Sequence, residues 1–357
     1  MIISFLLICL STYLIWKASA SFDIASSYLT RNLNEGIKGP TVNAIASSLP
    51  ELLISFFFLF YIGDIEGFSA GYATIIGSSI FNIAIIPTVS FLIIYYQQGV
   101  KLFPTDKKII EQDGFFLIIT EIILIVGLYL GGISITLAVI LILLYCLYIF
   151  LIFKKRNQKQ EDKNQEEIHF SPSKSNFTQK ILEVDVAGLI VRNKELSPFK
   201  AVVILLISLV IISAACKQLV SSSEHLSVQL HLNLFFITFF IAAVASSIPD
   251  AILSFRDAKN KKYKDSFSNA YGSNIFDICI GIGLPVLTYL LINGIDEIST
   301  ESSASSFSDI ILWSSILLVI FTIPITLVYW LKPINKARSS LIISLYIIFL
   351  GIIFFAS

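Results

Sequence analysis

Residues 46–51 read Ala46-Ser47-Ser48-Leu49-Pro50-Glu51, which places two hydroxyls, a proline and a carboxylate inside an apolar run from about residue 42 to residue 62. A run of this length can cross a bilayer core, which takes roughly 20 apolar residues. An acid at that depth costs about 2.5 to 3.5 kcal/mol on insertion scales, so it normally faces a protein or aqueous interior. Because proline offers no N–H to the carbonyl one turn back, backbone oxygens near Ala46 are freed beside the acid. Together these groups predict a pocket of oxygen atoms, which suits a hard cation.

The pattern occurs twice in the chain. It returns 199 positions later as Ala245-Ser246-Ser247-Ile248-Pro249-Asp250. A second pair of segments follows, in which Gly77-Ser78-Ser79-Ile80-Phe81-Asn82 matches Gly272-Ser273-Asn274-Ile275-Phe276-Asp277 with an offset of 195. In each segment the serine and the final amide or acid are four residues apart, so they share one face of a helix. A plain helical bundle has no need to repeat such a motif within lipid.

The composition is that of a membrane protein. Of the 357 residues 55% are hydrophobic and 14% are charged, whereas an ordinary soluble chain carries about 25% charged residues. The four cysteines fall within apolar runs, so neither a disulfide framework nor a CxxC metal pair is indicated. No Ser/His/Asp set, histidine cluster or phosphate loop indicates an enzyme, and nothing indicates a cofactor, a nucleic acid or an obligate protein partner. The expected partner is the lipid bilayer.

Hydropathy predicts ten membrane spans. The first apolar run resembles a signal peptide with Ala18-Ser19-Ala20 as its cleavage site, but no positive residue precedes the run, so we expect a retained helix. Between spans five and six lies a long polar segment, residues 154–199, which we expect to be a solvated linker. The spans are centred near residues 2–20, 40–62, 70–96, 114–131, 133–153, 201–219, 234–256, 267–292, 310–331 and 340–356.

The distribution of positive charge predicts the orientation of these spans. Of the 25 lysines and arginines, 23 fall in the loops that follow odd-numbered spans. The positive-inside rule then places both termini outside the cell membrane and residues 154–199 in the cytosol. The halves, residues 1–153 and 200–357, therefore have opposite orientations. We predict an all-α integral membrane fold of two inverted five-helix repeats, with ion sites on broken helices at the midplane.

The two paired blocks resemble the alpha repeats of the sodium/calcium exchangers, within the calcium/cation antiporter superfamily. The alpha motifs then cover about residues 40–96 and 239–292. The resemblance implies antiport across a membrane, with Ca²⁺ on one side of the exchange and Na⁺ usually on the other. It also implies that Glu51 and Asp250 are the central calcium-coordinating acids. The family's other ligand positions fall on Ser47, Ser48, Ser78, Asn82, Ser246, Ser247, Ser273 and Asp277, and on the carbonyl oxygens of Ala44 and Ala243.

The chain departs from the commonest family pattern in ways that indicate one branch. Asp250 stands where many members have glutamate, and serines stand where threonines are common. The change from Asn82 to Asp277 looks most like the potassium-dependent sodium/calcium exchangers. Three carboxylates, those of Glu51, Asp250 and Asp277, carry a charge of minus three, which one Ca²⁺ and one monovalent cation would neutralise. Alternatively, Asp277 stays protonated, and the sequence does not choose between these.

Several alternatives stay open at this point. A proton/calcium antiporter on the same fold is the main rival, and a channel is another. Interhelical hydrogen bonding is the alternative role for the ligand-position side chains of spans three and eight. Glu121, an acid in span four outside the repeats, could tune the site or bind a proton, but we expect a lone hydrogen-bonded acid. Spans one and six lie outside the repeats, and we expect them to shift so that the site opens to either face.

Overall fold

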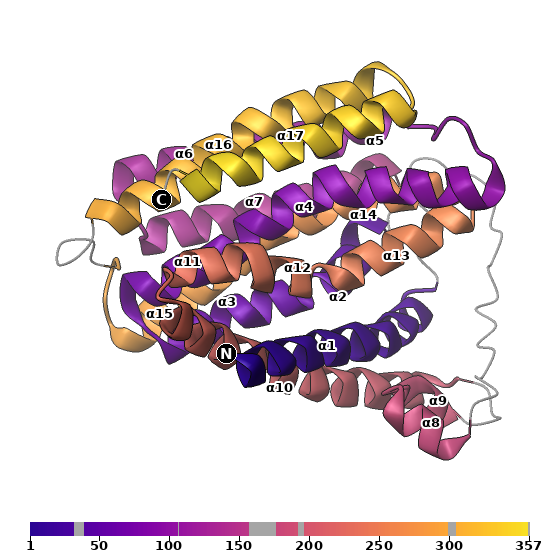
Figure 1. Cartoon of the computed structure of the whole chain (residues 1–357), viewed down its shortest axis with the longest axis horizontal. Helices are drawn as coiled ribbons and strands as arrows, with labels where there is room; N and C mark the ends of the chain where they lie inside the picture. Colours follow the sequence, from indigo (N-terminus) through magenta and orange to yellow (C-terminus); the bar gives the residue numbers. More distant parts are fainter. Residues whose placement is uncertain (32–38, 106, 157–175, 192–195, 299–304, 356–357) are drawn as a thin grey trace.

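A computed structural model describes residues 1–31, 39–105, 107–156, 176–191, 196–298 and 305–355, which form a bundle of helices (Figure 1). The first half contains α1 (Ile2–Leu29), the π-helical segment η1 (Gly39–Asn43), α2 (Ala44–Ser47), α3 (Leu49–Tyr61), α4 (Asp64–Gln98), α5 (Lys107–Ile109), the π-helical segment η2 (Ile110–Gly114), α6 (Phe115–Gly131) and α7 (Ile135–Arg156). The second half contains α10 (Pro198–Leu230), α11 (Leu234–Ile237), η3 (Thr238–Ala242), α12 (Ala243–Ser246), α13 (Ile248–Lys259), α14 (Tyr263–Phe276), η4 (Asp277–Ile282), α15 (Gly283–Asn293), α16 (Ser305–Leu331) and α17 (Lys336–Phe355).

The prediction of ten spans is confirmed in the described part of the chain. Nine helical stretches there are long and apolar enough to cross a membrane, and residues 41–61 supply a tenth span, which bends by 46° at its break. Some spans are longer than their apolar centres, since α4 has 35 residues and α10 has 33. At 1.5 Å per residue, a helix as long as α4 measures about 50 Å and extends beyond the ~30 Å hydrocarbon core. Hydropathy misses these ends because residues such as Asp64 and Glu66 are polar and still helical.

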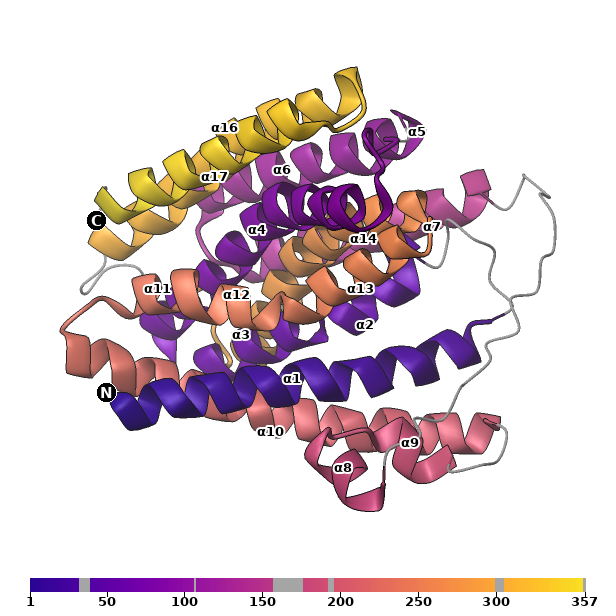
Figure 2. The ribbon, with the colours of Figure 1, turned by 45° about the vertical axis from the view of Figure 1, so that its right-hand side comes forward.

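The arrangement of α1 and α10 shows the inverted relation between the halves. The two helices lie side by side along one edge of the bundle, while α16 and α17 lie at the opposite edge (Figures 1 and 2). They run antiparallel, with Ser4 at the start of α1 donating a hydrogen bond to Gln229 near the end of α10 at 3.4 Å. They are the first spans of their halves. Equivalent helices must run in opposite directions when two five-span halves are inverted.

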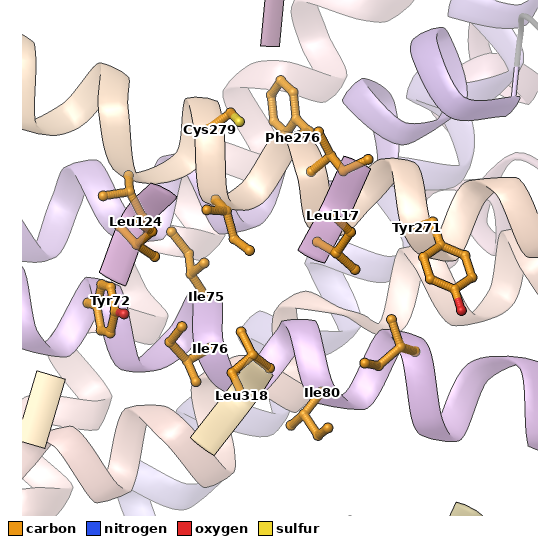
Figure 3. Close-up of a cluster of buried hydrophobic side chains, with 14 of the residues drawn as sticks. Tyr72, Ile75, Ile76, Ile80, Leu117, Leu124, Tyr271, Phe276, Cys279 and Leu318 are labelled. Carbon is orange, nitrogen blue, oxygen red and sulfur yellow. The ribbon is translucent and has the colours of Figure 1, made fainter. Parts of the chain in front are cut away.

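The centre of the bundle is α4, which packs against α3 of its own half and against α13, α14, α16 and α17 of the other. Figure 3 shows the apolar core on one side of it, where Tyr72, Ile75 and Ile76 meet side chains of α6, η4 and α16. Because α4 is enclosed on every side, it is apolar around most of its circumference. The second block of the first alpha motif, Gly77 to Asn82, lies in the buried part of this helix and brings Ser78, Ser79 and Asn82 into the interior.

Two isolated β-bridges join loops that the orientation rule places on the same side. Phe103, after span three, pairs with Ile334, after span nine. Ser134, after span four, pairs with Glu297, after span eight. Both pairings agree with a count of ten spans. The first joins two loops that follow odd-numbered spans, and the second joins two loops that follow even-numbered spans, so the partners of each pair lie on the same side of the membrane.

The expectation of a solvated linker is wrong for its later part. Residues 176–191 form two short helices, α8 (Phe177–Leu182) and α9 (Val186–Val191), and residues 157–175 and 192–195 lie outside the described residues. Val186, Ala187 and Val191 are buried against Ala25 of α1 and side chains of α10. The run Val-Ala-Gly-Leu-Ile-Val at residues 186–191 is apolar enough to dock, although it is too short to register as a span.

Candidate cation-binding site

Each half contains a span that breaks at the second serine of its motif. Ser48 (φ −89°, ψ 5°) ends α2, and Ser247 (φ −79°, ψ −2°) ends α12. Pro50 and Pro249 then occupy the first turns of α3 and α13, where a missing N–H costs no hydrogen bond. The predicted breaks are thus present at equivalent positions. They place Glu51 and Asp250 in the first turn of a helix, where the helix dipole favours negative charge.

The two breaks lie close together because the helix that follows the broken span in each half packs against the broken span of the other half. α4 packs on η3, α12 and α13, and α14 packs on η1 and α2. Gly77 makes one of these approaches possible, since a Cβ on it would lie 2.5 Å from the carbonyl oxygen of Phe239 and 2.7 Å from Cβ of Ala243. Only a residue without a side chain lets α4 come this close. All twelve ligand positions inferred from the sequence are buried at this meeting point.

Glu51 is fully buried and accepts hydrogen bonds from both halves. Ser78 Oγ lies 3.3 Å and Ser247 Oγ 3.2 Å from Glu51 Oε1. The Ser247 hydroxyl is also 2.7 Å from Ser78 Oγ and 2.8 Å from the carbonyl oxygen of Ala243. A hydroxyl has one proton to donate, so it satisfies only one of these acceptors at a time. Ser246 of the second half also lies beside this carboxylate.

Asp250, equally buried, is held mainly by its own half. Ser273 Oγ donates to Asp250 Oδ1 at 2.6 Å, and Asn269 Nδ2 lies 3.5 Å from the same oxygen. From the first half, Ser47 and Asn82 lie beside the Asp250 carboxylate. Serines of each half therefore reach the acid of the other, so the two halves form one site.

Asp277 lies at the start of η4, near Glu51 and Asp250, with Ser48 and Ser78 beside it. Its counterpart Asn82 donates from Nδ2 to Ser78 Oγ at 3.3 Å and to Asn274 Oδ1 at 3.1 Å. The Asn82 amide thus links hydrogen-bonding groups of both halves.

The remaining predicted ligands bond to their own helices. The Ser47 hydroxyl donates to the Asn43 carbonyl at 2.8 Å, and the Ser246 hydroxyl donates to the Ala243 carbonyl at 3.1 Å. The Ala44 carbonyl accepts the backbone N–H of Ser48 at 2.9 Å. The Ser47 and Ser246 hydroxyls keep lone pairs beyond the bonds they donate, so their oxygens can still contact a cation.

Several buried oxygens of the site have no hydrogen bond among the described residues. No lysine or arginine in that part of the chain forms an ion pair with the three acids. A buried acceptor left without a partner costs about 1 to 3 kcal/mol, and more when charged. The unpartnered atoms are Ser48 Oγ, Glu51 Oε2, Asn82 Oδ1, Asp250 Oδ2 and both carboxylate oxygens of Asp277.

The oxygen donors at the site are of the kinds that hard cations take. Within the described ranges, no three histidine, cysteine or acidic side chains are grouped closely enough to hold a metal by themselves. Hydroxyl, amide and carbonyl oxygens complete the set, and such mixed oxygen ligation suits Ca²⁺ and monovalent cations. The geometry brings oxygen ligands of both halves together in one buried site.

Some polar residues near the site were not singled out from the sequence. Asn274, which is not among the inferred ligand positions, donates to the backbone carbonyl of Ser79 at 2.8 Å and so joins α14 to α4. Asn269 contacts Asp250 and was missed, although it lies four residues before Ser273 and so on the same helix face. That spacing is the signal that would have found it.

Glu121 lies apart from the site, as expected for a separate acid. Thr322 of α16 donates to Glu121 Oε1 at 2.8 Å, which confirms that it is hydrogen-bonded. A second buried acid, Asp113 of η2, accepts a hydrogen bond from Ser268 at 2.8 Å and was missed as well. The hydrogen bond to Glu121 joins α16 to α6, and the hydrogen bond to Asp113 joins α14 to η2.

Comparison with known proteins decides the family. A family model described as "Sodium/calcium exchanger protein" matches residues 3–154 and 200–355, which is most of the chain and both halves. The chain belongs to this family. The stretch between the two matched regions coincides with the predicted linker. For this member of the sodium/calcium exchanger family, the resemblance inferred from the alpha motifs is therefore confirmed.

The curated relatives that match over part of the chain are sodium/potassium/calcium exchangers. Sodium/potassium/calcium exchanger 2 of Gallus gallus is 34% identical over 110 residues, which cover 31% of this chain and 16% of the relative. Sodium/potassium/calcium exchanger 1 of Bos taurus is likewise 34% identical over 110 residues, covering 31% of this chain and 9% of the relative. The matched stretch is a small part of these longer proteins.

Solved exchanger structures share the fold of this family member. The H⁺/Ca²⁺ exchanger CAX superposes with a TM-score of 0.64 at 18% identity, covering 99% of this chain and 86% of that one. The sodium-calcium exchanger NCX_Mj, soaked with Na⁺ and Sr²⁺, gives a TM-score of 0.58 at 22% identity, with 98% of both chains covered. Both superpositions extend over nearly the whole of this chain, so the three proteins share a fold.

Proposed function

We propose that this multi-pass membrane protein is an antiporter that exchanges Ca²⁺ for Na⁺ at a site shared by Glu51 and Asp250. The observation that carries the proposal is that one fully buried acid from each half enters the same site, and that each keeps an oxygen without a hydrogen bond. A cation is the partner that such oxygens require in the absence of a base. The matched relatives carry sodium, potassium and calcium in their names, which supports these ions as cargo.

The proposed ligands of Ca²⁺ surround these two acids. Ca²⁺ takes six to eight oxygens at about 2.3–2.6 Å, and carboxylate, hydroxyl, amide and carbonyl oxygens are all suitable. Sodium and calcium would use the same carboxylate oxygens, so that occupancy by one excludes the other. The proposed set comprises Glu51, Asp250, Ser47, Ser48, Ser78, Asn82, Ser246, Ser247, Ser273 and Asp277, with the carbonyls of Ala44 and Ala243.

The charge of Asp277 relates to the question of whether K⁺ is transported together with Ca²⁺. With all three acids ionised, the site carries a charge that Ca²⁺ together with one monovalent cation would balance. Both oxygens of Asp277 lack hydrogen bonds in the described structure, which supports a cation beside it. We propose K⁺ coupling on this basis, with a protonated Asp277 as the alternative.

The proposed mechanism is alternating access, in which the α1–α10 pair moves across the site. This pair lies at the edge of the bundle and packs over the break elements, with α1 against α2, α12 and α13, and α10 against α3. A displacement of the pair would open one side of the site and close the other. In the membrane, the positive-inside rule favours outward termini and a cytosolic segment 154–199.

The experiment that tests this function is calcium flux in vesicles reconstituted with the purified chain, with Na⁺, K⁺ and pH varied independently. Calcium uptake driven by an opposing Na⁺ gradient at constant pH is the expected result. Isotope exchange driven by a counter-gradient separates a carrier from a channel. A rate of calcium flux that does not change with the Na⁺ gradient would refute sodium exchange.

A second candidate function is proton/calcium antiport on the same fold. The observation in its favour is the superposition on a protein described as an H⁺/Ca²⁺ exchanger, which covers 99% of this chain. In the same vesicles, this alternative predicts calcium uptake that follows the pH gradient and persists without Na⁺.

A further inference from the structure

We propose that Asn269 and Ser254, together with Asp250, form a subsite for a monovalent cation one helical turn away from the main site. The inference deepens the proposed exchange function and rests on it. Neither Asn269 nor Ser254 is among the ligand positions inferred from the alpha motifs. The two side chains extend the site along α13 and α14 toward the turn at residues 260–262 that joins these helices.

Contacts place the three side chains together. Asn269 Nδ2 lies 3.2 Å from Ser254 Oγ and 3.5 Å from Asp250 Oδ1. Ser254 follows Asp250 by four residues on α13, and Asn269 precedes Ser273 by four residues on α14, so each lies one turn along its helix from the main site. All three are fully buried.

Two oxygens in this group have no hydrogen bond among the described residues, Asn269 Oδ1 and Asp250 Oδ2. A carboxylate oxygen, an amide oxygen and a hydroxyl make a hard ligand set with a single negative charge, and this charge matches a monovalent cation of the Na⁺ type. With the subsite empty, the amide N–H faces the carboxylate. A cation between Asp250 and Ser254 would turn the amide so that its oxygen faces the ion, since an amide carries an acceptor on one side and donors on the other.

The first half has no equivalent of the Asn269 amide. By the repeat offsets, Ser55 and Thr74 stand where Ser254 and Asn269 stand in the second half. The Thr74 hydroxyl donates to the Ala70 carbonyl of its own helix at 3.1 Å. α3 and α4 also approach closely there, because a Cβ on Gly71 would lie 3.1 Å from Ser55 Oγ. The amide thus belongs to one side of the site only, and we expect it to affect the binding of one exchanged ion more than that of the other.

The test compares two Asn269 variants with a matched control in the full-length protein. Asn269→Ala removes the amide, and Asn269→Asp keeps the side-chain oxygen and replaces the N–H donors with a second oxygen. Thr74→Val is the control at the equivalent position of the first half. Binding of radioactive sodium to the purified protein and sodium-driven calcium flux in vesicles are measured for each, with size-exclusion profiles to confirm folding.

For Asn269→Ala we expect the half-saturating Na⁺ concentration to rise about tenfold, the effect of losing one ligand, while that for Ca²⁺ stays within about twofold. Asn269→Asp should keep sodium binding near the unmodified level, and Thr74→Val should change neither ion. An equal weakening of Ca²⁺ and Na⁺ in both Asn269 variants would show that the amide only positions Asp250 and would overturn the subsite. Unchanged sodium binding in Asn269→Ala would overturn it while leaving the exchange function intact. If the unmodified protein neither binds sodium nor shows sodium-driven calcium flux, the exchange function fails, and the subsite fails with it.

Discussion

At the scale of single residues, the two central acids are supported differently. Glu51 accepts hydrogen bonds from Ser78 of its own half and from Ser247 of the other, whereas Asp250 accepts them from Ser273 and Asn269 of its own half. Ser78 and Ser273 are equivalent partners, and first-half residues also lie beside Asp250. The difference between the two acids is therefore Asn269, since Thr74 stands at the equivalent position of the first half.

The charge of these acids is the property we expect transport to require. Glu51→Gln or Asp250→Asn keeps the shape and one acceptor oxygen but removes the negative charge that holds a divalent ion. Each change should abolish calcium flux, with at least a tenfold loss expected from one charge-assisted ligand. Flux in reconstituted vesicles measures the loss, and size-exclusion profiles check that the variants remain folded. Exchange at the unmodified level in both variants would remove the site assignment.

Asp277→Asn tests the third charge, since it restores at this position the residue type that Asn82 has in the first half. If a monovalent cation balances Asp277, the variant should retain sodium-driven calcium flux and lose its dependence on K⁺. The measurement is calcium uptake at several K⁺ concentrations with Na⁺ and pH fixed. A K⁺ dependence identical to that of the unmodified protein would instead support a protonated Asp277.

At the scale of helical elements, the sequence predicted the spans and their breaks well because local chemistry decides both. Pro50 and Pro249 fix the breaks, and the apolar runs fix the spans. The π-helical segments η1 and η3, which precede the breaks, leave no comparable mark in the sequence. The docking of α9 was missed because burial of Val186 and Val191 depends on where α1 and α10 lie. Asn269 was missed because its role depends on Asp250 and Ser254, which lie on the neighbouring helix α13.

The close approach of α4 to the second half predicts that Gly77 tolerates no side chain. In Gly77→Ala the new methyl would meet the Phe239 carbonyl oxygen at 2.5 Å, and this overpacking should cost about 1 to 3 kcal/mol. We expect a lower melting temperature in detergent and reduced calcium flux. Gly351→Ala on α17 is a matched control, since a Cβ there has no neighbour within 4 Å. Equal stability of the two variants would contradict the proposed packing.

At the scale of the whole molecule, one ion pair joins the element that is proposed to move to the part that holds the site. Arg256 of α13 lies 2.8 Å from Asp23 near the end of α1. The two residues belong to opposite halves, and Arg256 lies about 9 Å along α13 from Asp250, toward the end that the positive-inside rule favours as cytosolic. A shift of α1 along α13 must stretch or break this pair.

This ion pair should therefore influence how fast the protein changes between its two states, but not how tightly it binds ions. The arginine side chain is 50% exposed and the aspartate 13% exposed, and a partly exposed pair contributes about 0.2 to 1 kcal/mol, which corresponds to a rate change of up to about fivefold. Asp23→Asn and Arg256→Gln should each change the maximal rate of calcium flux by this amount and leave the half-saturating Ca²⁺ concentration within about twofold. The exchanged pair Asp23→Arg with Arg256→Asp should restore most of the original rate, because the attraction between α1 and α13 returns with its charges reversed. If the single variants changed calcium affinity instead of rate, Arg256 would act on the site through α13, and the motion of α1 past it would lose this support.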